Sequence, residues 1–169
     1  GASPAALIQE GLNASRADIL AILPAGFNPF PGFFEASVKA LINAPFADAV
    51  LPSVRIVTEE NRFQPFMHWL PIGAAVHDGL FANFMSRGCV VARRAFLEEF
   101  PPDETLTAEW VWDLLLRGAY AGRRYLILDE PLLETIPRVL FDSNSHYEEQ
   151  RREPLATLRR PSSVTGPEA

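Results

Sequence analysis

The sequence predicts an α/β domain in which a mixed, mostly parallel sheet is flanked by helices. Two observations favour this class. Segments with apolar residues at helical spacing alternate with short apolar runs rich in β-branched residues, as they do in layered α/β proteins. The chain has 169 residues, of which 48% are hydrophobic, so it is long enough and apolar enough to bury a core.

The first half of the chain predicts a helix, a strand, a loop, a helix and a strand. Residues 5–15 carry apolar side chains at helical spacing, and residues 18–23 form a short apolar run with β-branched side chains. Residues 24–32 contain three prolines and two glycines, which predicts a rigid loop at the carboxyl end of the strand. The helical spacing returns over residues 33–43, and residues 49–57 predict the next strand.

Helix and strand patterns continue to alternate further along the chain. Residues 86–92 predict a buried strand, and residues 93–100 predict a short helix that Pro101 and Pro102 end. Residues 63–84 are rich in aromatic residues, Pro and Gly and fit neither period, so they are not assigned.

The most regular helical pattern covers residues 107–121. Thr107 suits the N-cap, Glu109 lies in the first turn where a carboxylate is favourable, and Gly122 suits the C′ position. A further strand is predicted over residues 125–128, where an Asp-Glu-Pro sequence ends it.

The expected organisation is one domain between two short flanking segments. Residues 1–3 have the composition of an expression remnant, and residues 4–147 form the α/β domain. Residues 148–169 are charged and then rich in Pro and Ser, which is typical of a loose tail.

Composition excludes several functions. The formal charge is −6, from 15 basic and 21 acidic residues, which argues against general nucleic-acid binding. Cys89 is the single cysteine, which excludes an intramolecular disulfide and a multi-cysteine zinc site, and its apolar strand indicates a small core residue. No apolar run reaches the roughly 18 residues of a membrane span and no leader is visible, so we expect a cytoplasmic protein and leave peripheral membrane association open.

Four segments resemble motifs of the family-2 glycosyltransferases, in that family's order and approximate spacing. They are a Gly-Leu and Asp before an apolar strand (11–23), Pro-Gly-Phe-Phe-Glu (31–35), Arg-Gly before an apolar strand and Arg-Arg-Ala-Phe (87–96), and an acidic helix ending in Arg (107–117). The resemblance covers roughly residues 5–146 and implies the later part of a nucleotide-diphospho-sugar transferase fold of the GT-A type. The family's first βαβ half would precede these residues and is absent from the sequence.

The sequence departs from the family where the family binds a metal. Pro24, Ala25 and Gly26 stand in place of the Asp-x-Asp motif, so this motif is degenerate. Trp110 follows Glu109 where a second acidic residue is expected, and residues 137–140 replace the Tyr-Arg-x-His motif. All three departures affect metal-assisted departure of the diphosphate, so we expect that metal-dependent catalysis is lost or replaced, with no metal ligands and no cofactor evident.

Two carboxylates are the catalytic candidates that the resemblance implies. Glu109 would be the base that accepts the proton of the acceptor hydroxyl, with Asp113 one turn later assisting it. The alternatives are that Glu109 only stabilises its helix terminus and that Asp113 pairs with Arg117 at spacing i, i+4.

Substrate-binding candidates come from three regions of the chain. The resemblance places the donor at Pro24, Ala25 and Gly26, and an acceptor loop at His77 and Asp78. Arg93 and Arg138 are candidates because a guanidinium can bind phosphate oxygens in place of a metal. For Arg93, together with Arg94, the alternative is a solvated pair on the surface.

The function that follows from the resemblance is transfer of a sugar from a nucleotide-sugar donor to a sugar or lipid-linked acceptor, in bacterial surface-polysaccharide synthesis. A different class also fits: a non-catalytic glycosyltransferase remnant that binds a partner protein or another copy of itself through the exposed part of the aromatic-rich segment, residues 63–84. A wider set of aromatic residues could form a platform for a sugar or a lipid: Phe27, Phe30, Phe33, Phe34, Phe66, Trp69, Phe81 and Phe84. Core packing or a subunit contact is the alternative role for most of them. A third possibility is an unrelated α/β domain whose matches are accidental.

Overall fold

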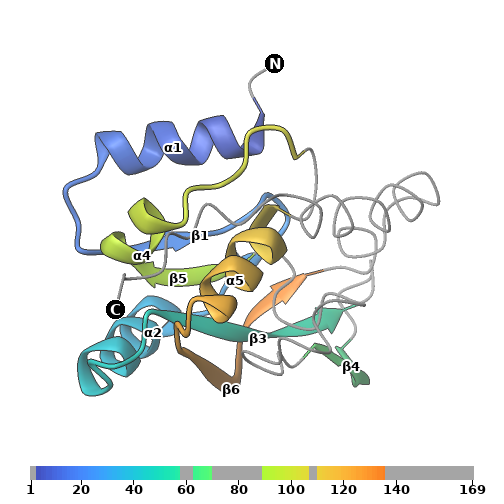
Figure 1. The fold of residues 1–169 in the computed structure, drawn as a ribbon. Helices are drawn as coiled ribbons and strands as arrows, with labels where there is room; N and C mark the ends of the chain where they lie inside the picture. The colour runs from blue at the N-terminus through green and yellow to red at the C-terminus, as the bar shows by residue number, and fades with distance from the viewer. Residues whose placement is uncertain (1–2, 58–62, 70–88, 107–109, 136–169) are drawn as a thin grey trace.

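The computed structural model describes residues 3–57, 63–69, 89–106 and 110–135, and of residues 63–69 it describes the backbone only (Figure 1). The helices are α1 (Pro4–Ala14), α2 (Phe33–Asn43), α4 (Arg94–Glu99) and α5 (Trp110–Tyr120). The strands are β1 (Ile19–Ile22), β2 (Asn28–Pro29), β3 (Ala49–Val57), β4 (Phe63–Trp69), β5 (Val90–Arg93) and β6 (Tyr125–Thr135). The α/β class predicted from the sequence is confirmed.

The sheet is mixed, and the expectation of a mostly parallel sheet is wrong. Its strand order is β1-β5-β3-β6-β2, and β4 pairs with β3. Among these strands only β3 and β6 are parallel neighbours, whereas the other pairs are antiparallel. The alternation of strands and helices favoured parallel neighbours, and it did not predict that β5 lies between β1 and β3 and runs in the opposite direction to both.

The short connection between the two edge strands curls the sheet. A flat sheet would separate β1 from β2 by four inter-strand spacings, roughly 19 Å. Five residues join Ile22 to Asn28, and they include a turn in which the Phe27 N–H donates to the Pro24 carbonyl at 3.4 Å. Because a turn holds its ends within about 7 Å, this connection is too short to cross a flat sheet, and the edges approach each other.

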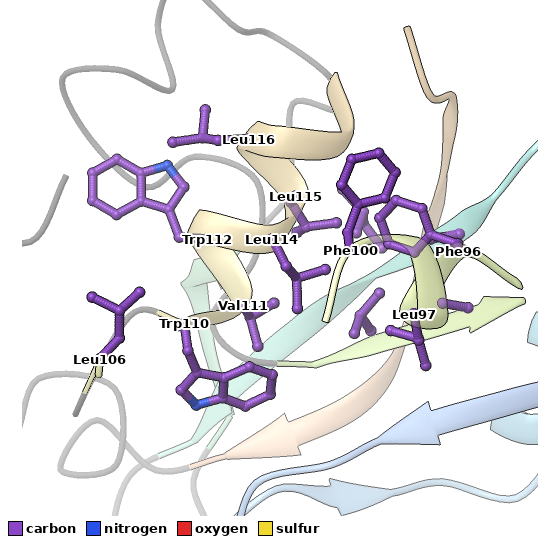
Figure 2. Close-up of a cluster of buried hydrophobic side chains, with 14 of the residues drawn as sticks. Phe96, Leu97, Phe100, Leu106, Trp110, Val111, Trp112, Leu114, Leu115 and Leu116 are labelled. Atoms are coloured by element: carbon purple, nitrogen blue, oxygen red, sulfur yellow. The ribbon is translucent and has the colours of Figure 1, made fainter. Parts of the chain in front are cut away.

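Helices cover both faces of the sheet, which explains why β3 is buried along almost its whole length. Alternate β3 residues face different cores: Ala49 and Leu51 belong to the cluster under α1, α4 and α5, and Val50 and Val54 belong to the cluster under α2. Figure 2 shows the first cluster, in which the side chains of α4 and α5 meet above the strands. The amphipathic patterns of the sequence thus produce three layers.

A close approach at Gly118 fixes how α5 packs. A Cβ atom at this position would lie 2.6 Å from Cε2 of Phe96 and against the hydroxyl of Tyr125. That hydroxyl donates to the Leu115 carbonyl at 2.7 Å, and burial, with the charge of Asp48 adding to it, raises the pKa of Tyr125, which keeps the donor proton in place. Only a glycine therefore allows α4, α5 and β6 to meet here.

We expect Gly118→Ala to lower the free energy of unfolding by up to about 2 kcal/mol, since overpacking of about 1–3 kcal/mol is set against a helix-propensity gain of about 1 kcal/mol. Gly11→Ala is the matched control, because Gly11 is helical in α1 and a Cβ there meets nothing within 4 Å. That variant should be slightly stabilised. Urea unfolding measures both, and a Gly118→Ala protein as stable as Gly11→Ala would contradict this packing.

Cys89 lies in the core under α2 with 1% of its surface exposed, as its apolar surroundings in the sequence predict. Burial raises the pKa of its thiol. We expect Ellman's reagent to label native protein at pH 8 only as fast as the core opens, and urea-unfolded protein at once. Because the unfolded chain releases the thiol proton first, stability should also fall as pH rises above the ordinary pKa of cysteine. Complete labelling of native protein within seconds would contradict the buried position.

Candidate functional site

The carboxyl ends of β1, β3 and β6 lie at one edge of the sheet, which we call the carboxyl edge. This follows because β3 and β6 are parallel and β1 has the same direction as β3. Ligands of open α/β sheets bind outside such an edge, where loops leave the strands. The described residues at this edge are therefore the candidate site.

The loop that the sequence predicted as a donor-binding element lies at the carboxyl edge. Pro24, Ala25 and Gly26 follow β1 after one residue, Leu23, and lie in a turn in which Gly26 has a φ of +89°. The Thr135 hydroxyl, at the end of β6, donates to the Gly26 carbonyl at 2.9 Å. Thr135 is 1% exposed, so this bond fixes the loop against the last strand.

The residues of this loop do not fit a divalent metal. Pro24, Ala25 and Gly26 have no side-chain oxygen, and the Gly26 carbonyl already accepts a hydrogen bond from Thr135. In the described ranges, no group of three or more His, Cys, Asp or Glu side chains could hold an ion. We therefore derive no catalytic step through a metal at this position.

A guanidinium and a carboxylate meet on neighbouring strands close to this loop. Arg55 of β3 and Glu134 of β6 are register partners, and Arg55 Nη2 donates to Glu134 Oε2 at 2.8 Å. The Arg55 guanidinium also lies over the ring of Phe30, with Cζ 4.4 Å from the ring centroid. The two charged side chains keep 33% and 20% of their surface exposed, so the pair is half-buried and reachable.

Sequence reasoning did not find Arg55, Glu134 or their contact with Phe30. One signal was available: Arg55 is the one charged residue in a nine-residue apolar strand, and a charge in such a strand needs a partner. The partner is 79 residues away, and its identity depends on the parallel pairing of β3 with β6.

Asp113, a catalytic candidate, forms the ion pair that its spacing predicted. Its Oδ2 accepts from Arg117 Nε at 2.8 Å, and Asp113 is 4% exposed. Arg117 also donates to the Pro101 carbonyl at 2.7 Å, which ties α5 to the end of α4. Among the residues that the structure describes, these contacts give Asp113 a structural role: it holds Arg117, which joins α5 to the end of α4.

Arg93, a substrate-binding candidate, lies at the opposite edge of the sheet. It pairs in register with Ile19 at the start of β1, whereas the Pro24 loop follows the end of that strand. Its side chain donates to the carbonyls of Leu41 and Ala47 at 2.7 and 2.9 Å. The structure does not bring Arg93 to the loop, and the solvated pair with Arg94 is not observed either, since Arg94 donates to backbone carbonyls of the α1 end.

The remaining site candidates, Glu109, His77, Asp78 and Arg138, lie outside the described residues. Whether Glu109 faces the Pro24 loop is therefore left as a prediction.

The aromatic residues of the first half divide between core and surface. Phe27 and Phe33 are buried at 8% and 1% exposure, as the core-packing alternative predicts. Phe34 is 51% exposed on α2, and Phe30 contacts Arg55. The side chains of the other four aromatic candidates lie outside the described part of the chain.

Comparison with known proteins adds no family: no family model matches the sequence, and no curated protein matches it. None of the helices in the described ranges has the length and apolar character needed to cross a bilayer.

Proposed function

We propose that this domain binds a nucleotide-sugar donor and transfers the sugar to an acceptor hydroxyl on a sugar or lipid-linked molecule, in bacterial surface-polysaccharide synthesis in the cytoplasm. The observation that carries the proposal is the position of Pro24–Gly26. The loop that corresponds to the family's donor motif lies at the carboxyl edge, fixed by Thr135 and close to the Arg55–Glu134 pair.

The chemistry of the proposal requires two groups besides the loop. Departure of a nucleoside diphosphate develops negative charge, which a positive group must stabilise where no metal is held. Arg93 is at the wrong edge for this role, which leaves Arg138 as the candidate among the predicted arginines. The acceptor hydroxyl requires a base, for which Glu109 is the candidate.

Isothermal titration calorimetry with UDP-, GDP- and dTDP-sugars tests the proposal. We expect saturable binding of at least one nucleotide sugar, with the same affinity in manganese and in EDTA, because the loop offers no metal ligand. A strictly manganese-dependent affinity would refute the metal-free form of the proposal. Absence of binding to every donor would refute the glycosyltransferase function.

A second candidate function is that of a protein-interaction or self-association module. It is favoured by apolar side chains on the outer surface of α2, where Phe34 and Ile42 are 51% and 64% exposed and Phe46, just beyond the helix, is 58% exposed. Light scattering coupled to size exclusion tests self-association, with Phe34→Ser/Ile42→Ser as the comparison. A dimer that the double variant dissociates supports this function, whereas a monomer in both refutes self-association through α2.

A further inference from the structure

We propose that two copies of this chain pair through α2, with the two α2 helices antiparallel across a two-fold axis and Glu35 of each copy beside Lys39 of the other. The inference rests on the second candidate function, self-association through α2, and adds to it the identity and the orientation of the partner. It follows from the two stripes of side chains along the helix and from the charges beside the outer stripe.

Helix α2 has a second apolar stripe beside the one that it buries. Its buried stripe recurs every fourth residue and consists of Phe33, Ser37 and Leu41. The same spacing is repeated one residue later by three further apolar side chains, Phe34, Val38 and Ile42. Successive residues lie about 100° apart around a helix, so this outer stripe is turned away from the buried one. Phe34 and Ile42 are exposed, and Val38 is half-buried.

No other described helix covers the outer stripe. The buried side chains of α2 belong to the core cluster on one face of the sheet, and within the described ranges that cluster contains no residue of α1, α4 or α5. Figure 1 shows α2 on the side of the sheet away from α1 and α4. Because Phe34 and Ile42 are also exposed, the stripe is open to a second molecule.

The charges beside the stripe indicate the chemistry of that molecule. Glu35 and Lys39 are exposed one turn apart on the same flank of the helix, and Lys39 is the single lysine of the chain. Among the described residues, neither side chain takes part in an ion pair. One negative and one positive charge suit a protein surface that carries the same two charges in reverse order. They give an anionic lipid surface no excess of basic residues to bind.

A second copy of α2 carries those charges in reverse order when it is antiparallel to the first. A two-fold axis that makes two helices antiparallel keeps the charged flank on the same side of both copies, as in antiparallel coiled coils. An axis level with residues 37 and 38 places Glu35 opposite Lys39 of the other copy. The same axis places Phe34 opposite Ile42 of the other copy. A parallel pair would put the two charged flanks on opposite sides of the contact, where they would not meet.

The contact is small, so the dimer should be weak. Each copy contributes one helix of eleven residues, which covers less than the roughly 800 Å² per partner of a standard interface. We therefore expect a dimer that forms at protein concentrations of about 100 µM and dissociates on dilution.

Charge reversal tests the orientation, with the association of the whole chain measured by sedimentation equilibrium. Glu35→Lys leaves only positive charge on the flank and Lys39→Glu only negative charge, so each variant alone should dimerise about tenfold more weakly than wild type. An equimolar mixture of the two variants should recover the wild-type association, because each positive flank then meets a negative one. The matched control is Glu10→Lys, which reverses an exposed carboxylate on α1 and should leave the association unchanged.

The possible failures are distinguishable. A wild-type dimer that Phe34→Ser/Ile42→Ser dissociates but neither charge reversal weakens would keep self-association through α2 and overturn the antiparallel pairing. A mixture as weak as the single variants would also overturn the pairing. A wild-type monomer at every concentration would refute both. If circular dichroism shows that Glu35→Lys loosens the first turn of α2, Lys39→Glu alone should still weaken the dimer.

Carbodiimide cross-linking locates the contact, because the reagent joins a carboxylate to an amine that touches it and Lys39 carries the single side-chain amine. The sample is a mixture of isotope-labelled and unlabelled protein, which separates links between copies from links within one chain. We expect mass spectrometry to find Lys39 of one copy joined to Glu35 of the other. Links between copies from Lys39 to other carboxylates only would overturn the pairing. Neither measurement involves a nucleotide sugar, so the dimer and the transferase can fail separately.

Discussion

Replacing Asp113 by alanine is expected to lower the free energy of unfolding by about 3 kcal/mol. The carboxylate is 4% exposed and accepts from Arg117 Nε at 2.8 Å, so its removal deletes a charge-assisted hydrogen bond and leaves a guanidinium partly buried without that counter-charge. Loss of one partner of a buried pair typically costs about 3–5 kcal/mol, and the 33% exposure of Arg117 places this pair at the lower end. Urea unfolding of the variant and the wild type measures the difference.

The matched control is Glu98→Ala, which removes the carboxylate of a second pair with the same i, i+4 spacing. Arg94 and Glu98 are 3.6 Å apart and Glu98 is 56% exposed, so solvent screens the attraction. We expect a change below about 0.5 kcal/mol for this variant. Similar losses in the two variants would show that burial does not distinguish the pairs.

Asp113→Asn separates the structural role of Asp113 from a catalytic one. In the structural interpretation stability falls while nucleotide-sugar binding per folded molecule stays the same. A variant of wild-type stability with lost transfer activity would instead restore Asp113 to the catalytic candidates.

The sequence predicted the elements whose pattern is local. The helix over residues 33–43 and the strand over residues 49–57 coincide with α2 and β3, because each has a continuous apolar face. Gly122, predicted at C′ of the long helix, has a φ of +79° and donates to the Ala119 carbonyl at 3.0 Å. These features depend only on residues close together in the chain.

The features that the sequence did not predict depend on pairing between distant segments. The two-residue β2 lies in a Pro-rich loop and exists because β6 pairs with it. Strand β6 was predicted to stop at Leu128, but it resumes pairing at Leu133, opposite Val54, after an irregularity that contains Pro131. The same extension brings Glu134 to Arg55. The sequence therefore predicted the loop of the candidate site, because the loop is a local motif. It did not predict the ion pair, because the two residues come from distant segments.

The second large effect is expected for Arg94→Met, which should lower the free energy of unfolding by about 3 kcal/mol and release α1 from the domain. The Arg94 guanidinium donates to the carbonyls of Leu12, Ser15 and Ala17 at 2.9–3.0 Å. Leu12 lies in the last turn of α1, whose final carbonyls have no partner within the helix. Hydrogen bonds to a charged group are worth about 1.5–3 kcal/mol each when buried, and the 22% exposure of Arg94 reduces their sum.

Methionine keeps the apolar stem of Arg94, so the variant isolates the loss of the three hydrogen bonds from a loss of packing. Because those bonds join α4 to the end of α1, hydrogen exchange of the α1 amides should accelerate more than that of β3. Arg16→Met, at an exposed position in the connection between α1 and β1, should leave both exchange and stability unchanged. Uniform acceleration across the sheet and α1 would mean that α1 unfolds only with the whole domain. Unchanged stability would mean that water replaces all three bonds, and that the buried side chains of α1, among them Ala5 and Leu12, hold the helix against the core.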